Sequence, residues 1–273
     1  MKVAGYGILG LSFLIFSAMA IHHQQNISLT DYRIHISTDN GMFFLNENDV
    51  KQIIQDNNYD VGKTSGDLDY NRLEKIIENN SYCENAEIKL SPDGEVNVEI
   101  LQRVPVLRII NKYGVGFYLD KSGKKLPLSD KFTARVVVAT GNISDSGISE
   151  DTSDAVNTSK LFQIASFICT DSFLNALIEQ INVTNEGEFE LIPKVGNHNI
   201  LLGDEKNLSE KTEKLKIFYR EGLSKVGWQQ YSVINLKYAN QVFATRNDVK
   251  PYAPPVIVTV PVSSTDTTKQ TNH

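Results

Sequence analysis

The sequence predicts an α+β protein in which an N-terminal transmembrane helix precedes two exported domains, and three observations support this prediction. An uncharged apolar run opens the chain over residues 3–21. Residues 25–103 then show apolar periodicity in the order strand, helix, helix, strand, strand. Residues 104–246 follow mainly the two-residue period of strands. The expected organisation is an anchor over 1–24, a βααββ domain over 25–103, a mixed β-rich domain with flanking helices over 104–246, and a tail over 247–273.

The N-terminal run is long enough to cross a bilayer. Val3 to Ile21 carries no charge, and as a helix it spans about 28 Å, close to the thickness of the hydrocarbon core. Lys2 precedes it, so the positive-inside rule keeps the N-terminus cytoplasmic and exports the rest. A cleaved signal peptide is the alternative, because Ala18-Met19-Ala20 fits the cleavage pattern. The length of the run favours a retained anchor.

The composition is that of a globular protein with an acidic balance. Of the 273 residues, 41% are hydrophobic and 22% are charged, and the formal net charge is -6 at pH 7. This length suffices for one large or two medium-sized domains, each with its own core. The negative charge and the absence of a basic stripe argue against a nucleic-acid partner, since phosphates are bound by clustered Lys and Arg.

Two amphipathic helices and three strands are expected over 25–103. Apolar and polar residues alternate around Tyr32–Ile36, which predicts a strand. Asn46 and Asp69 are the expected N-caps of the two helices. The turn Ser91–Gly94 separates two alternating runs and predicts a hairpin. Neither helix can bury its apolar stripe alone, so both should pack on one face of a three-stranded sheet.

Strand patterns dominate the second domain. We expect strands over 106–110, 115–119, 135–139, 181–184, 189–192, 199–202, 230–238 and 242–246, and helices over 161–178 and 208–223. The last helix should bury Leu215, Phe218 and Tyr219, and the polar segment Asp145–Thr158 should be a loop. The tail is rich in Pro, Ser and Thr, and we expect it to be mostly disordered, apart from an apolar interruption over 256–262.

The sequence contains no recognisable catalytic or metal site. Residues 5–10 match the GxGxxG fingerprint, but they lie inside the apolar run and do not follow a strand. The five histidines show no metal-ligand spacing. Cys83 and Cys169 fall in different predicted domains, and we interpret both as small buried hydrophobic residues. We therefore expect no cofactor, no metal and no enzymatic activity, with an exported enzyme as an open alternative.

Several short motifs follow one another in a fixed order along the chain. The junction of the predicted domains reads Gln102-Arg103-Val104-Pro105-Val106, Asp120-Lys121-Ser122-Gly123 follows it, and Ile234-Asn235-Leu236-Lys237-Tyr238 lies near the end. The βααββ order is that of a POTRA domain. With its N-terminal span and these motifs, the chain resembles the FtsQ/DivIB family of bacterial cell-division proteins, particularly members from Bacteroidetes-like organisms. Asn235 departs from the Asp of many relatives, which puts any interaction that needs this charge in doubt.

The resemblance implies a non-enzymatic scaffold of the divisome. Members of this family lie in the bacterial inner membrane as single-pass proteins, with most of the chain periplasmic and enriched at the division septum. They recruit FtsB and FtsL, and through them the septal wall synthase, without a cofactor. For this chain the resemblance therefore implies FtsB/FtsL-like partners, and a role of the POTRA unit in localisation or docking.

An edge strand is the expected binding element, because its unpaired backbone groups allow a partner segment to add a strand. We expect the last predicted strand to offer this edge. The candidate binding residues are Val242, Phe243, Ala244, Thr245 and Arg246, with Val233 and Lys237 on the neighbouring strand. Val242 and Phe243 can equally be interpreted as core residues.

Two further expectations concern the domain junction and the class of protein. Arg103 and Pro105 should set the angle between the domains, since proline lacks a ladder N–H and suits the start of a strand. A solvated Arg103 is the alternative. The second functional interpretation is a POTRA-bearing component of outer-membrane assembly or secretion. Such proteins usually carry several POTRA repeats or a β-barrel of many alternating strands, whereas this sequence shows one such unit.

Overall fold

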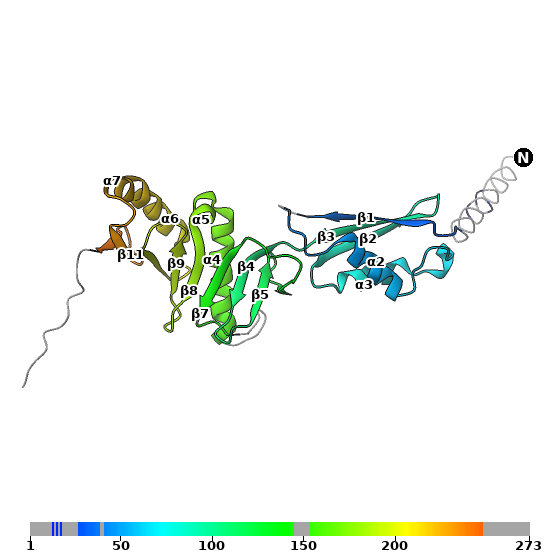
Figure 1. The fold of residues 1–273 in the computed structure, drawn as a ribbon, viewed down its shortest axis with the longest axis horizontal. Helices are drawn as coiled ribbons and strands as arrows, with labels where there is room; N and C mark the ends of the chain where they lie inside the picture. Colours follow the sequence, from blue (N-terminus) through cyan, green and yellow to red (C-terminus); the bar gives the residue numbers. More distant parts are fainter. Residues whose placement is uncertain are drawn as a thin grey trace, which may run out of the picture.

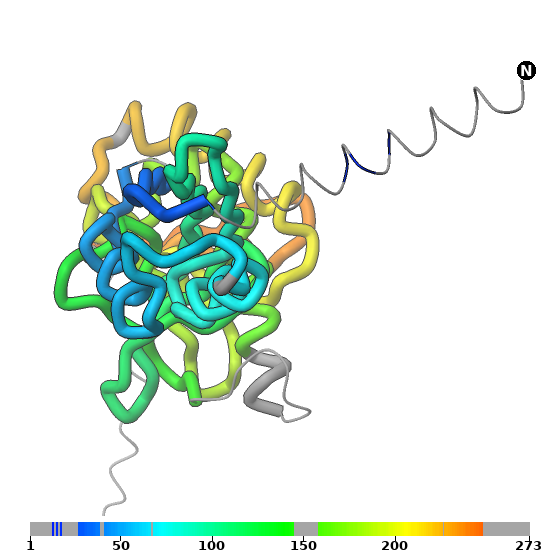
Figure 2. Tube along the Cα trace, turned by 90° about the vertical axis from the view of Figure 1, so that its right-hand side faces the viewer, coloured from blue at the N-terminus to red at the C-terminus, as the bar shows by residue number. Residues whose placement is uncertain are grey.

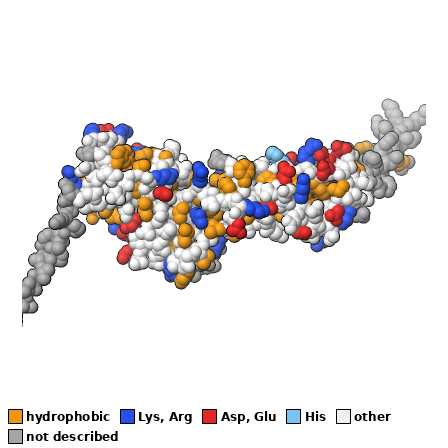
Figure 3. Space-filling model, viewed as in Figure 1, with side chains coloured by type: hydrophobic (Ala, Val, Ile, Leu, Met, Phe, Trp, Pro, Cys, Tyr) orange, Lys and Arg blue, Asp and Glu red, His pale blue; other side chains and the backbone are white. Residues whose placement is uncertain are grey.

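The computed structural model describes residues 27–38, 41–144 and 153–247, together with Phe13, Ile15 and Ser17. Two domains lie end to end along the long axis (Figure 1), and charged and hydrophobic side chains are interspersed on the face of both domains that Figure 3 shows. Figure 2 looks along this axis, with the first domain in front of the second. Most of the predicted span over 3–21, and the predicted tail beyond Asn247, lie outside the described residues. Within them, no helix combines the length and apolar character needed to cross a membrane.

The first domain has the predicted βααββ order. Its elements are β1 (Asp31–Ser37), α2 (Glu47–Asp56), the short 3-10 helix η1 (Ser65–Asp67), α3 (Tyr70–Glu78), β2 (Cys83–Leu90) and β3 (Glu95–Gln102). The sheet order is β1-β3-β2, with β1 parallel and β2 antiparallel to β3. The parallel pair requires a crossover connection, and α2 and α3 provide it. Both helices lie on the same side of this sheet (Figure 1), as expected.

Local capping explains where the two helices begin. The Asn46 side chain accepts a hydrogen bond from the Asp49 backbone N–H, and the Asp49 carboxylate accepts one from the Asn46 N–H, each at 3.0 Å. Asp69 likewise accepts from the Arg72 N–H at 3.0 Å. Both predicted N-caps are confirmed. The helices bury Val50, Ile54, Leu73 and Ile77 against the sheet.

The described residues of the second domain form one nine-stranded sheet. Its strands are β4 (Pro105–Ile110), β5 (Gly116–Asp120), β6 (Lys125–Pro127), β7 (Val137–Gly141), β8 (Ile178–Val183), β9 (Phe189–Pro193), β10 (Asn199–Gly203), β11 (Tyr231–Asn235) and β12 (Phe243–Arg246). They are ordered β12-β11-β10-β9-β8-β7-β4-β5-β6, so β12 and β6 form the two edges. The helices are α4 (Ser153–Thr170), α5 (Ser172–Leu177), α6 (Leu208–Ile217), the π-helical turn η2 (Phe218–Leu223) and α7 (Ser224–Val226).

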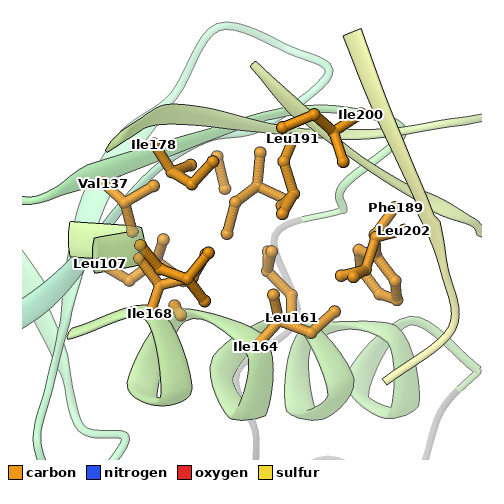
Figure 4. Packing of buried hydrophobic residues seen from close by; sticks show 14 of the residues in the cluster. Leu107, Val137, Leu161, Ile164, Ile168, Ile178, Phe189, Leu191, Ile200 and Leu202 are labelled. Atoms are coloured by element: carbon orange, nitrogen blue, oxygen red, sulfur yellow. The ribbon is translucent and has the colours of Figure 1, made fainter. Parts of the chain in front are cut away.

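One helix covers the centre of this sheet. Leu161, Ile164 and Ile168 of α4 point toward apolar side chains of the strands (Figure 4). Those side chains include Leu107, Val137, Ile178, Phe189, Leu191, Ile200 and Leu202, all members of one buried cluster. The helix α4 therefore packs across the strands from β4 to β10, while α5, α6 and η2 add Leu174, Leu215 and Tyr219 to the same buried cluster.

Several sequence expectations for this domain were wrong. The predicted loop over 145–158 overlaps α4, which begins at Ser153, because polar residues in the first turns of a helix lack apolar periodicity. The predicted helix over 161–178 breaks at Asp171, whose side chain caps α5 by accepting from the Leu174 N–H. The strand β6 has three residues, too few for a periodic pattern.

Two expectations about burial also need correction. Cys83 is buried, but Cys169 is exposed, because the helix places it on a different face from its buried neighbour Ile168. In the helical region over 208–223, Leu215 and Tyr219 are buried as predicted, while Phe218 is only partly buried.

An aromatic cluster joins the two domains. Phe44, in the loop that precedes α2, is 2% exposed and stacks on Tyr82 with ring centroids 5.0 Å apart. Its ring also meets Tyr118 and Phe132 of the second domain edge-on, at 5.6 and 5.1 Å. Such aromatic pairs add to the free energy gained by burial. Phe44 is thus a side chain of the first domain buried in a cluster that both domains share.

Candidate functional site

The strand β12 forms one edge of the large sheet. It pairs with β11 through Tyr231↔Arg246, Val233↔Thr245, Ile234↔Ala244 and Asn235↔Phe243, and it has no other partner among the described strands. Backbone groups on the outer side of an edge strand lack a ladder partner. The sequence-predicted binding segment over 242–246 therefore coincides with an edge of the described sheet.

The pairing separates the two faces of this edge. Ile234 is fully buried, so its pair Ala244 lies on the core side. Phe243 and Thr245 lie on the opposite face, paired with Asn235 and Val233. The Phe243 side chain is 50% exposed.

The two residues at the start of the edge differ in burial. Val242 packs against the main core, as the core interpretation expects. The exposed Phe243 instead forms an edge-to-face pair with Tyr238, which is 51% exposed, at a centroid distance of 4.9 Å. An exposed aromatic pair beside a free strand edge is a typical anchor for a partner. Tyr238 ends the motif Ile234–Tyr238, but no local pattern marks it as a site residue, because its contact with Phe243 depends on the fold.

The connection between β11 and β12 is held by α6. The Lys214 ammonium donates hydrogen bonds to the backbone oxygens of Tyr238, at 2.5 Å, and of Leu236, at 3.5 Å. The Asn240 N–H donates to the Glu210 carboxylate at 3.4 Å, and Asn240 adopts a positive φ of 59°. These contacts end the predicted strand over 230–238 early, since the chain turns after Asn235.

Asn235 accepts a hydrogen bond from the Lys237 backbone N–H at 2.9 Å through its side-chain oxygen. An aspartate would offer the same acceptor, so the Asn found here preserves this turn contact without the charge.

Lys237 is an exposed cation that already has a partner. Its ammonium lies 2.6 and 2.8 Å from the two carboxylate oxygens of Glu188. This hydrogen bond with Glu188 raises the pKa of Lys237 above its ordinary value. An acidic group of a binding partner would have to compete with Glu188 for this ammonium.

The described residues also line two cavities away from the β12 edge. One, of about 590 Å³, lies between the connection that follows α2 and the helix α3, and its lining includes Lys63 and Arg72. The other, of about 180 Å³, lies beside Lys211, whose ammonium is bonded to Asp204 at 2.6 Å. No group of three or more His, Cys, Asp or Glu side chains in the described part of the chain could hold a metal ion.

The junction residues lie between the two sheets. Arg103 Nη1 donates to Asp120 Oδ2 at 2.9 Å, and their side chains are 13% and 4% exposed, so the alternative of a solvated Arg103 is wrong. Pro105 is the first residue of β4 and is buried. Sequence reasoning missed the neighbouring Gln102, which is 1% exposed.

Gln102 fastens the loop that carries Phe44. Its side-chain oxygen accepts from the N–H groups of Phe44, at 3.0 Å, and Leu45, at 2.9 Å. Its side-chain nitrogen donates to the Met42 oxygen at 2.6 Å. The side chain thereby meets the hydrogen-bonding needs of an otherwise irregular buried segment.

Comparison with known proteins identifies both domains. Residues 104–245 match the family described as FtsQ/DivIB, C-terminal related, over more than half of the chain. The chain belongs to the FtsQ/DivIB family. Residues 30–101 match the POTRA-like domain, in agreement with the βααββ order of the first domain. No curated protein matches the chain.

Membership in the FtsQ/DivIB family confirms the resemblance drawn from the motifs. The family is associated with bacterial cell division and consists in general of scaffold proteins without enzymatic activity. The family match covers β4 to β11 and all of the edge strand β12 except its last residue, Arg246.

Proposed function

We propose that this protein is a non-enzymatic divisome scaffold that captures a partner by strand addition to β12. The observation that carries the proposal is a strand edge with an exposed aromatic pair, Phe243 and Tyr238, within the FtsQ/DivIB-related domain. A partner strand would gain main-chain hydrogen bonds from β12 and side-chain contacts from this pair. Under this proposal the partners are FtsB/FtsL-like division proteins, which connect the scaffold to the septal wall synthase.

The side chains around the edge suit a partner segment with an apolar residue. Phe243 and Tyr238 offer exposed apolar surface, whereas the ammonium of the neighbouring Lys237 is already held by Glu188. Val233 and Thr245 form a cross-strand pair on the Phe243 face. Val242 and Ala244 lie on the core side. They therefore hold the strand in place and do not contact the partner directly.

The proposed location is the inner membrane at the division septum. The apolar run over 3–21 would anchor the chain, with both domains in the periplasm. The buried contacts of Phe44 and Arg103 support a defined orientation between the POTRA-like domain and the β12 edge. A scaffold of this kind would hold its partner at a set position relative to the membrane.

Affinity capture from its own cell envelope tests the proposal. The full tagged chain in detergent should recover small coiled-coil division proteins, identified by mass spectrometry. Phe243→Asp and Thr245→Asp should each weaken this capture at least about tenfold, because a charge at the edge opposes desolvation. Val115→Asp is the matched control, since Val115 is also 50% exposed but lies beside β5, away from β12. Unchanged capture by the folded edge variants would refute strand addition at β12.

Recovery of outer-membrane assembly factors in place of division proteins would favour the second interpretation, a POTRA-bearing assembly component. Such a result would leave the fold and the family assignment intact. Loss of these factors with Phe243→Asp would then assign their binding to the β12 edge.

A further inference from the structure

The strand β2 forms one edge of the three-stranded sheet in the first domain, and α3 lies along this edge. The Ile88 backbone N–H donates to Glu74 Oε1 at 2.8 Å. The Ala86 N–H donates to Glu78 Oε1 at 3.3 Å. The outward backbone groups of an edge strand are the usual site of strand addition. At β2, two of these groups are already bound by the helix.

The spacing of the two glutamates matches the spacing of the two N–H groups. Glu74 and Glu78 are four residues apart on a helix, which corresponds to a rise of about 6 Å. Ala86 and Ile88 are two residues apart on a strand, which corresponds to about 7 Å. The carboxylates therefore bind alternate N–H groups of β2, as the carbonyl groups of a neighbouring strand would.

The core of the domain holds the two carboxylates at the edge. Leu73 and Ile77 of the same helix are fully buried, so α3 is fixed against the sheet. Both hydrogen bonds to β2 are partly buried, and a hydrogen bond to an ionised acceptor is stronger than one between neutral groups. A strand that adds to β2 would have to displace both carboxylates.

The solvent face of β2 carries charges of both signs. Glu87 and Lys89 are exposed, and the Lys89 ammonium lies 2.9 Å from a Glu87 carboxylate oxygen. The same ammonium lies 4.0 Å from Glu99 of β3. Because these pairs are exposed, they can exchange partners at little cost in free energy.

This charge order makes β2 complementary to a second β2. In an antiparallel pair with its two-fold axis at Ile88, Glu87 of one copy lies opposite Lys89 of the other, and the axis produces this contact twice. On the core side, Ala86 lies opposite Leu90 and two Ile88 side chains meet. An axis at Glu87 would instead place two glutamates opposite each other, which is unfavourable.

We propose that β2 is a docking edge for a second copy of this chain, and that Glu74 and Glu78 hold this edge closed. The carboxylates occupy the N–H groups that the second strand needs, so the copies pair through the first domain only when the carboxylates leave. No residue of β12 takes part. The inference therefore stands or falls independently of the proposed function.

Hydrogen exchange of the dilute full chain in detergent micelles tests the closure of the edge. Glu74→Ala/Glu78→Ala should accelerate amide exchange at Ala86 and Ile88 by about tenfold, because both N–H groups lose their acceptor. Glu74→Gln/Glu78→Gln is the matched control, since glutamine keeps a side-chain oxygen that accepts a hydrogen bond. Exchange in this control should stay close to that of the wild type.

Sedimentation of the same proteins over a range of concentrations tests the pairing. The mass of the double alanine variant should rise with concentration toward about twice that of the wild type. Addition of Lys89→Glu should return it to the wild-type mass, because like charges then lie opposite each other. Further addition of Glu87→Lys restores opposite charges and should restore association.

Each result supports or overturns one part of the proposal. Unchanged exchange at Ala86 and Ile88 in the alanine variant would show that the carboxylates do not close the edge. Faster exchange with the wild-type mass at every concentration would exclude a second copy as the occupant. Association that persists with Lys89→Glu would exclude the register about Ile88. Glu74→Ala alone frees the Ile88 N–H and gives the same readings if the double variant does not fold.

Discussion

Arg103 and Asp120 form a buried ion pair at the point where the chain passes from the POTRA-like domain to the second domain. The second carboxylate oxygen of Asp120 accepts from the Ser122 N–H, the Ser122 hydroxyl and the Lys124 N–H, at 2.6–2.8 Å. The motifs around Arg103 and Asp120 thus form one structural unit. In it, the aspartate of a turn in the second domain binds the arginine of the domain junction.

Removal of the arginine should destabilise the second domain. Arg103→Ala leaves the carboxylate of Asp120 buried without its cation, and we expect a loss of about 3–5 kcal/mol. Arg220→Ala is the control, because the Arg220–Glu221 pair lies in the same domain, has an arginine side chain that is 71% exposed and should cost less than about 1 kcal/mol. Urea unfolding followed by Trp228, the one tryptophan of the sequence, reports on this domain. Similar losses in both variants would contradict the assignment.

Asp120 should also make the second domain sensitive to acid. Burial raises its pKa, but hydrogen bonds from Ser122, Lys124 and Arg103 outweigh burial, so that the pKa of folded Asp120 lies below its ordinary value. The stabilisation is therefore complete above the unfolded pKa of about 3.9 and is lost as the pH falls through the lower folded value.

Asp120→Asn removes this titration. Between about pH 4 and pH 2 the urea midpoint of the variant should fall less steeply than that of the wild type. Near neutral pH the variant should be the less stable protein, since it lacks the ion pair. Parallel curves over the acidic range would show that other carboxylates, such as Asp171 and Asp204, dominate the acid sensitivity.

The relative orientation of the two domains should depend on Phe44 and not on the neighbouring Phe43. Phe44→Ala removes a 2% exposed ring from the cluster shared by both domains, whereas Phe43 is 62% exposed. Spin labels at Lys75 and Lys194, in a Cys169→Ser background, should give a broader distance distribution in Phe44→Ala than in Phe43→Ala. Equal widths in both variants would mean that Gln102 and Arg103 alone fix the orientation.

Local signals account for the parts of the fold that could be predicted. The N-caps Asn46 and Asp69 act on backbone groups within three residues, so the sequence contains the whole interaction. The break at Asp171 was missed because apolar residues continue on both sides of it. The start of α4 was missed because its first turns are polar.

Non-local contacts account for what was missed at the candidate site and the junction. The edge position of β12 agrees with the expectation for the last strand, but the roles of Tyr238 and Gln102 depend on distant partners. Gln102 contacts Phe44, which is 58 residues away, and no periodic pattern reports such a contact. A glutamine beside an arginine at a domain boundary was the available signal.

A glycine near the end of β7 provides a test of the pairing in the central sheet. Gly141 has φ +100°, and a Cβ placed there would lie 2.2 Å from the Val183 backbone oxygen of β8. Gly141→Ala should therefore destabilise the domain by about 2–4 kcal/mol, because backbone must shift as well as adopt a strained φ. Gly114→Ala isolates the strain alone, since Gly114 has φ +81° with no atom within 4 Å, and should cost only about 1 kcal/mol. Trp228 fluorescence in urea measures both variants. Equal losses would mean that β8 can move aside without cost, in conflict with its packing against α4.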